Sequence, residues 1–263
     1  MLDGLADCAA GLKARGIAFV VRHGMPGEVA LSLSHQAAAV ICDRSYMPAQ
    51  RDWRETLAEA ATCPVVQVET EVVVPVDVVS DKSEYAARTI RPRIHRVWDE
   101  YLVPLDETET DVRADALALE SDLDPADPAG VLTALDLDRS VKPVTRFRGG
   151  RVAALEMLKR FVDDVLDGYA TGRNEPSAAQ TSFLSPYLHF GHISPVEVAL
   201  AARDSGIGAT GDRGSFIEEL VVRRELAMNY ANFAPGFETY DALPDWARKT
   251  LSEHAGDARE YVY

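Results

Sequence analysis

Short apolar runs and segments of helical periodicity alternate along the first part of the chain. Residues 1–16 predict an amphipathic helix, because apolar side chains recur there at helical spacing at Leu2, Leu5, Cys8, Ala9 and Leu12. The same two patterns predict helices over 27–36 and 47–61 and strands over 17–21, 38–42 and 65–68. Strands that alternate with helices indicate a parallel, Rossmann-like sheet and hence the α/β class.

The region after the third predicted strand changes character. Residues 71–79 are apolar and are expected to be extended. Asp81, followed three residues later by Glu84, predicts a capping pair for a helix that continues through Arg88.

An acidic segment divides the sequence. From Asp106 to Asp138 there are eleven acidic residues against one basic residue, Arg113. Pro104, Pro125 and Pro128 exclude a long continuous helix. The pattern predicts a partial Rossmann-like α/β domain over 1–103, a linker over 104–140 and an all-helical domain over 141–263.

The sequence beyond Ser140 has helical periodicity only. Two apolar helix faces are predicted there, one formed by Val152, Leu155, Leu158, Phe161, Val162, Val165 and Leu166 and the other by Phe216, Leu220, Val221 and Leu226. We expect several helices and no strand in this part.

Composition narrows the functional classes. The 263 residues are 47% hydrophobic, contain no run long enough to span a bilayer and begin without a signal peptide, so we expect a soluble cytoplasmic protein. The three cysteines lack metal-ligand spacing and predict reduced thiols. A net charge of -15 argues against nucleic acid, but two local basic patches leave a DNA-facing surface open: Lys142, Arg146, Arg148, Arg151, Lys159 and Arg160, and Lys82, Arg88, Arg91, Arg93 and Arg96.

Two motifs carry candidate chemistry. Thr181 to Ser185 (TSFLS) precede an apolar helix, where hydroxyls and unpaired N–H groups form a socket for phosphate or simply cap the helix. Arg22-His23-Gly24 follows a predicted strand, as in histidine phosphatases, but no second histidine and arginine are identifiable, and an ordinary strand-end loop is the alternative. His189 and His192 lack a third ligand, so we expect no metal site.

A longer pattern surrounds the hydroxyl motif. It consists of Tyr169, Arg173, Asn174, Pro176, Thr181, Ser182, Leu184, Ser185, Pro186, Tyr187, Leu188, Gly191 and Ser194 in one order and spacing. This stretch resembles the flavin-binding segment of the photolyase/cryptochrome family. With 80–92 (SDKSEYAARTIRP), 216–229 (FIEELVVRRELAMN) and 240–251 (YDALPDWARKTL), nearly the whole chain resembles class II cyclobutane pyrimidine dimer photolyases.

The resemblance implies a function and a set of site residues. It implies an antenna-type α/β domain, an unidentified antenna chromophore, and FAD bound in the helical domain by Tyr169, Thr181, Ser182, Phe183, Leu184, Ser185 and Phe216. Light-excited flavin would pass an electron to a pyrimidine dimer flipped out of damaged DNA.

The resemblance also assigns residues to the substrate. Glu219 matches an acid that hydrogen-bonds the dimer bases from a dry pocket, or else is an exposed partner of Arg223 four residues on. Arg173 matches a DNA or lesion contact, with a solvated loop arginine as the alternative. The positions assigned to cofactor phosphate or DNA are Arg223, Arg224 and Asn229.

Relative to the family, the sequence resembles a fragment truncated at both ends. We therefore expect weak FAD retention, exposed apolar faces that favour association, and catalysis that depends on whether the cofactor is held. A cryptochrome-like photoreceptor and a non-catalytic DNA- or nucleotide-binding remnant are the alternative functions.

Overall fold

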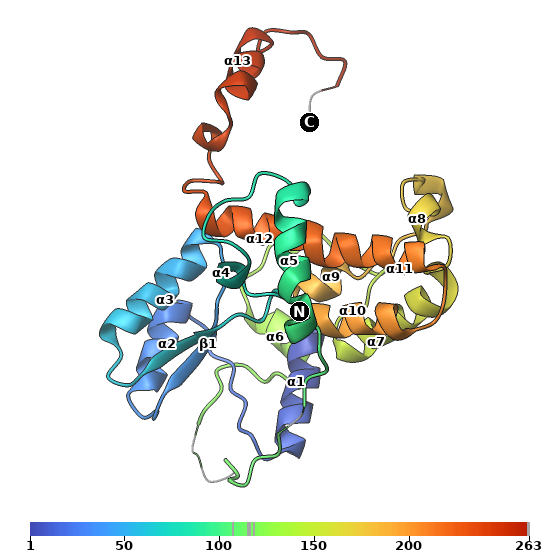
Figure 1. Ribbon diagram of the computed structural model, residues 1–263. Helices are drawn as coiled ribbons and strands as arrows, with labels where there is room; N and C mark the ends of the chain where they lie inside the picture. Colours follow the sequence, from blue (N-terminus) through green and yellow to red (C-terminus); the bar gives the residue numbers. More distant parts are fainter. Residues whose placement is uncertain (107, 115–116, 118, 262–263) are drawn as a thin grey trace.

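A computed structural model describes residues 1–106, 108–114, 117 and 119–261. Its first part contains α1 (Leu2–Ala14), α2 (Pro26–Ser34), β1 (Val40–Asp43), α3 (Pro48–Ala60) and β2 (Val65–Val68). The two strands are parallel, with Val40 opposite Val65 and Asp43 opposite Val68. Helices α2 and α3 pack together beside the sheet (Figure 1).

Local sequence explains these elements. Proline occupies the first turn of both α2 and α3, where its fixed φ suits a helix and no N–H group is needed. The two strands carry β-branched residues, and Leu57 of α3 is buried. The expected helices over 1–16, 27–36 and 47–61, the strands over 38–42 and 65–68 and their parallel pairing are confirmed.

The strand expected over 17–21 is wrong. In place of sheet pairing, the Val21 N–H donates to the Ser121 hydroxyl at 2.9 Å, and its carbonyl accepts from the Asp122 N–H at 2.9 Å. The acidic linker therefore supplies this segment's main-chain partners. An apolar, β-branched run favours extension, but a strand also requires a neighbouring strand in register.

The capping pair is also wrong. Residues 76–79 form a helical turn, α4 (Val76–Val79), and the next helix, α5 (Ala87–Tyr101), begins well after Asp81. Glu84 is buried, accepts a hydrogen bond from Ser80 at 2.8 Å and pairs with Arg93 at 3.1 Å. These contacts hold Glu84 inside the protein, so it does not cap a helix.

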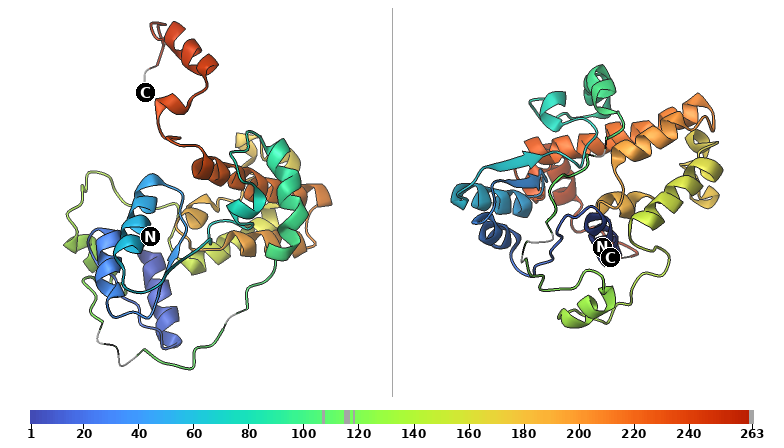
Figure 2. Two further views of the ribbon diagram at one scale, coloured as in Figure 1. Left: turned by 60° about the vertical axis from the view of Figure 1, so that its left-hand side comes forward. Right: turned by 90° about the horizontal axis from the view of Figure 1, so that it is seen from below.

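Helices continue through the second part of the chain. They are α6 (Pro128–Ala134), α7 (Arg151–Arg160), the π-helix η1 (Phe161–Val165), α8 (Tyr169–Gly172), the 3₁₀-helix η2 (Pro176–Ala178), α9 (Ser185–His189), α10 (Pro195–Asp204), α11 (Thr210–Ile217), the π-helix η3 (Glu218–Arg223), α12 (Arg224–Phe233), the 3₁₀-helix η4 (Tyr240–Ala242) and α13 (Asp245–Glu253). Within the described ranges no strand follows β2. Helices α11, η3 and α12 form one continuous long helix, and α13 projects away from the body (Figures 1 and 2).

One hydrophobic core joins the two parts of the chain. Val74, Ile90 and Ile94 lie in the same buried cluster as Phe161, Leu166, Val198 and Val221. Helices α4 and α5 therefore pack on the helical part, although they precede the acidic linker. The division at residue 103 stays a prediction. None of the helices in the described part of the chain combines the length and apolar character needed to cross a lipid bilayer.

Candidate functional site

The long helix carries three candidate site residues in its π-helical segment. Glu218, Glu219 and Arg223 all lie in η3, the π-helical segment between α11 and α12. A π-helical segment inside an α-helix is uncommon and occurs often at functional sites. The segment displaces these side chains from the spacing of an ordinary α-helix.

Helix α8 is fixed against the start of the long helix by Asp212. This carboxylate accepts from the N–H of Gly168 at 3.1 Å and of Ala170 at 2.8 Å, and these hydrogen bonds lower the pKa of Asp212. Gly168 has φ 78°, a left-handed conformation that favours glycine and starts the turn of α8. Tyr169 and Arg173 therefore have fixed positions beside η3.

Three aromatic rings form the inner wall of this region. The ring centroids of Phe161 and Phe216 are 4.4 Å apart, and Tyr169 meets Phe216 edge-on at 5.5 Å. Tyr169 and Phe216 are both buried, and burial raises the pKa of the Tyr169 hydroxyl while Arg173 opposes that rise. Two residues predicted to contact the cofactor thus touch one another.

Arg173 and Glu219 form an ion pair beside this wall. An Arg173 Nη lies 2.7 Å from a Glu219 carboxylate oxygen, and the two side chains are 31% and 36% exposed. The predicted lesion acid and the predicted DNA arginine are therefore brought together, although the sequence separates them. Arg223 is not the partner of Glu219, and the pocket around Glu219 is not dry.

The neighbouring carboxylate, Glu218, has two arginine partners. Arg91 of α5 donates to it through two nitrogens, at 3.0 and 2.6 Å, and Arg223 lies 3.4 Å away. The hydrogen bond from Arg91 is the main reason that the pKa of Glu218 is lowered despite its partial burial. Arg91 of α5 and Arg173 at the end of α8 thus bind two adjacent carboxylates of η3.

The hydroxyl motif adopts a shape suited to an anion. Phe183 has φ 54° and Leu184 has φ -84° and ψ -10°, and such alternation of left- and right-handed residues turns successive N–H groups toward one side. Ser182 accepts from the Leu184 N–H at 3.3 Å, whereas the hydroxyl-bearing side chains of Thr181 and Ser185 are exposed. Helix α9 has only 5 residues, so local N–H groups matter more here than a helix dipole.

Neighbouring side chains hold this motif in place. The Gln180 amide donates to the carbonyls of Val165 at 2.6 Å and Asp167 at 2.7 Å, which ties the segment to the end of η1. The Arg146 guanidinium lies over the Phe183 ring at 4.7 Å. These residues fit a phosphate group, because hydroxyl donors, N–H groups and a nearby guanidinium lie together.

Of the three remaining predicted residues, one lies at the surface and two face the α/β part of the chain. Arg223 is the last residue of η3, and its side chain is 54% exposed. Arg224 is partly buried, which lowers its pKa, and its guanidinium donates to the Glu71 carbonyl. Asn229 is buried and bonds the Glu84 N–H at 2.7 Å and the Lys82 carbonyl at 3.0 Å. Arg224 and Asn229 thus face the α/β part of the chain.

Sequence reasoning missed Glu225. Its side chain is 2% exposed, and one carboxylate oxygen accepts from the N–H of Val73 at 2.5 Å and of Val74 at 3.3 Å. The other oxygen is buried without a hydrogen-bond partner among the described residues. Burial raises the pKa of Glu225 to about 7. The available signal was its position four residues after the apolar Val221 and four before Asn229.

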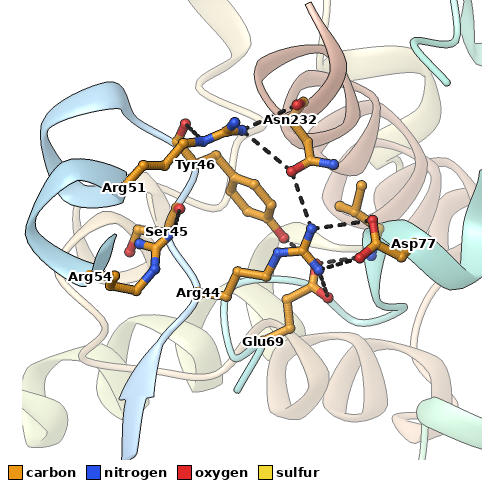
Figure 3. A network of polar contacts seen from close by, with 9 residues as sticks. Arg44, Ser45, Tyr46, Arg51, Arg54, Glu69, Asp77 and Asn232 are labelled. Atoms are coloured by element: carbon orange, nitrogen blue, oxygen red, sulfur yellow. Dashed lines mark hydrogen bonds and ion pairs between the residues drawn. The ribbon is translucent and has the colours of Figure 1, made fainter. Parts of the chain in front are cut away.

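A polar network extends this contact along α12 (Figure 3). Arg44 bonds Asp77 at 2.6 Å and Asn232 at 3.2 Å, and Arg51 donates to the Asn232 carbonyl at 3.2 Å. Tyr46 donates to Glu69, and burial, followed by this hydrogen bond, raises the pKa of Tyr46. Glu225, Asn229 and Asn232 therefore form a polar stripe on α12 that binds the α/β part.

Two concavities in the described part of the surface lie away from this site. One, of about 640 Å³, is bounded by α1 and the linker around Asp124, and another, of about 410 Å³, lies between α3 and the chain after α12. Neither includes Tyr169, Glu219 or the hydroxyl motif. Arg22 of the Arg-His-Gly motif pairs with Asp122 at 3.0 Å, so a linker carboxylate is its partner.

Comparison with known proteins shows which proteins this chain is similar to. Residues 1–111 match the family described as DNA photolyase. Three proteins named deoxyribodipyrimidine photo-lyase match 100% of this chain: that of Methanothermobacter thermautotrophicus is 39% identical, that of Oryza sativa 36% and that of Potorous tridactylus 32%. The comparisons support placing the chain in the photolyase/cryptochrome family. The chain spans about half the length of these relatives, covering 57%, 54% and 49% of them.

Solved structures of this family share the fold. A class III photolyase from Agrobacterium tumefaciens superposes with a TM-score of 0.67 at 20% identity, covering 96% of this chain and 55% of that one. A Synechocystis cryptochrome gives 0.72 at 18% identity, covering 88% and 50%. The expected fold class, a parallel α/β part followed by a helical part, is confirmed.

Proposed function

We propose that this chain acts as a deoxyribodipyrimidine photolyase of the class II kind, repairing cyclobutane pyrimidine dimers in DNA. The observation that carries the proposal is the Arg173 and Glu219 ion pair beside the Tyr169 and Phe216 rings. These residues come from distant parts of the sequence, yet they converge at one π-helical segment. The shared name of the curated relatives supports the same reaction.

FAD is the proposed cofactor, since the residues around the hydroxyl motif fit a diphosphate. The exposed hydroxyls of Thr181 and Ser185 would donate to phosphate oxygens, and Ser182 and Phe183 would offer the adjoining N–H groups. Leu184 would support them, because its own N–H donates to the Ser182 hydroxyl. When bound, reduced FAD supplies the light-excited electron that splits the dimer. The rings of Tyr169 and Phe216 exclude water from the inner side.

Glu219 and Arg173 would meet the flipped-out lesion. An ionised Glu219 carboxylate can accept hydrogen bonds from the N–H groups of the dimer bases. Arg173 holds that carboxylate at 2.7 Å and, being 31% exposed, keeps donors available to DNA phosphates. Arg223 would add a second phosphate contact on the same segment.

Arg224 and Asn229 have a structural role in this proposal. Both side chains bind the backbone of residues 71–84 and thereby fix the long helix on the α/β part. They would position η3 without touching DNA or cofactor.

The test is light-dependent repair by the purified chain. An oligonucleotide with one thymine dimer, mixed with protein, FAD and a reductant, should regain intact thymines under blue light and none in the dark. Glu219→Gln should slow repair about tenfold, the loss expected for one hydrogen bond in the activated complex. Glu253→Gln, on exposed α13, is the matched control.

Two outcomes would contradict the proposal. One is the absence of light-dependent repair by a chain shown to contain FAD, which would favour a cryptochrome-like photoreceptor. The other is equal slowing by Glu219→Gln and Glu253→Gln, which would remove Glu219 from the site.

A further inference from the structure

Helix α5 carries a concentration of positive charge. Residues 82–98, which lead into α5 and form most of it, include five basic residues and one acidic residue, Glu84, a local net charge of +4 in a chain whose total is -15. The acidic residues Asp81, Asp99 and Glu100 flank this stretch. Glu84 is buried and paired with Arg93, so it contributes little negative potential at the surface. We call the surface formed by Lys82, Tyr85, Arg88, Arg91 and Arg96 the α5 basic face; Arg91 is partly buried and the other four are exposed.

The α5 basic face is preorganised. Arg88 and Arg96 are exposed and lie eight residues apart, which places their side chains about two turns apart along the helix and about 80° apart around its axis. Arg88 donates to the Tyr85 hydroxyl at 2.8 Å, and its guanidinium lies 5.3 Å from the centroid of that ring. Tyr85 is itself 73% exposed. An exposed aromatic ring beside an arginine offers both stacking and a phosphate contact.

The rest of the protein holds this face rigidly. Asn229 binds the Lys82 carbonyl and the Glu84 N–H, and Arg93 bonds Glu84. The segment that leads into α5 is therefore fixed to α12. The backbone that carries these cations would therefore lose little conformational freedom on binding a partner, and the cost is confined to the side chains.

The α5 basic face is continuous with the candidate site. Arg91 binds Glu218 through two nitrogens, Arg223 approaches the same carboxylate, and the adjacent Glu219 binds Arg173. Helix α5 stands against the long helix near the junction of α11 and α12 (Figures 1 and 2). Arg91, Arg223 and Arg173 thus place three positive charges around the carboxylates of Glu218 and Glu219.

We propose that the α5 basic face binds the phosphate backbone of the DNA duplex beside the lesion held at Arg173 and Glu219. The inference rests on the proposed function and extends its surface to α5, a helix that holds none of the predicted site residues. Charge complementarity supports it, because phosphate contacts supply most of the affinity of proteins for DNA. The described part of the acidic linker contacts Val21 and Arg22, which lie before β1.

The experiment measures binding of the full chain to an undamaged, fluorescein-labelled 20-base-pair duplex by anisotropy, in the dark and without FAD, from 25 to 200 mM KCl. The double variant Arg88→Ala/Arg96→Ala should bind about tenfold more weakly at 50 mM KCl. Its log–log salt slope should be shallower by about 1.8, or about 0.9 for each lost phosphate contact. Both side chains are exposed, so circular dichroism should be unchanged.

The control removes the same charge from another exposed helix. Arg248→Ala/Lys249→Ala, on α13, should leave affinity and salt slope close to the wild type. Three results would overturn the proposal: no duplex binding by the wild type, equal losses in both double variants, or displacement by polyglutamate at charge concentrations equal to those of duplex DNA.

This test separates the surface from the reaction. Duplex binding that depends on Arg88 and Arg96, in a chain without light-dependent repair, would support the surface and contradict the photolyase proposal. Repair with an unaltered salt slope would support the reaction and contradict the surface.

Discussion

Two carboxylates on one helix occupy opposite environments. Glu225 is 2% exposed, receives main-chain hydrogen bonds from Val73 and Val74, and has its pKa raised by burial to about 7. Glu219, six residues earlier, is 36% exposed at its side chain and pairs with Arg173. The long helix thus presents one acid to the interior and one to the surface.

The difference shows what each half of the helix does. A buried carboxylate bonded to backbone N–H groups fixes the α/β part on α12, because leaving those groups unpaired is costly. An exposed ion pair contributes little to stability, so its arrangement is available for binding. Stability and recognition are therefore separated along one continuous element.

The largest expected effect concerns the inner carboxylate. At pH 5, Glu225→Ala should lower the free energy of unfolding by about 3 kcal/mol, since it leaves two buried N–H groups without partners and opens a cavity. Glu219→Ala should lower it by less than about 1 kcal/mol. Urea denaturation of both variants and the wild type measures the difference. Equal losses would abolish the distinction between the two halves.

A second expected effect is a dependence of stability on pH. The folded-state pKa of Glu225, about 7, lies above its ordinary value of 4.5, so the folded protein holds this proton more tightly. The stabilising contribution is then complete below about pH 4.5 and is lost as the pH rises through about 7. At about 1.4 kcal/mol per pKa unit the loss is bounded at about 3.5 kcal/mol, and we expect about 2 kcal/mol.

Glu225→Gln measures that contribution, because glutamine keeps the acceptor oxygen and does not titrate. The groups that act on Glu225 electrostatically are Arg224 and Glu69. Relative to the wild type, the variant should gain about 2 kcal/mol in unfolding free energy between pH 5 and pH 8. Parallel pH profiles for the two proteins would show that Glu225 does not titrate in this range.

The sequence predicted the elements whose signals are local. Helices α1 and α3 and strands β1 and β2 follow from periodicity, since each pattern reports which face of the element is buried. The segment 17–21 carries the same apolar signal as β1, yet its hydrogen-bond partners come from the linker. Strand formation depends on a neighbour that a local pattern does not specify.

The sequence also predicted only part of the candidate site. The resemblance placed Tyr169, Arg173, Phe216 and Glu219 in one functional region, but the ion pair results from Asp212 tying α8 to the long helix. Asp81 and Glu84 satisfied a local capping rule, which the tertiary contact with Asn229 overrides. The burial of Glu225 also depends on packing between distant segments.

The central claim is that the half of this helix that carries Glu219 forms a flavin site together with the hydroxyl motif. FAD binding tests this claim most directly. Titration of FAD with the chain, followed by flavin fluorescence, should show saturable binding that Thr181→Ala/Ser185→Ala weakens at least about tenfold through lost phosphate hydrogen bonds. Thr210→Ala/Ser252→Ala, outside the motif, should bind as the wild type does. Absence of binding by the wild type, or binding indifferent to the Thr181 and Ser185 changes, would contradict the account.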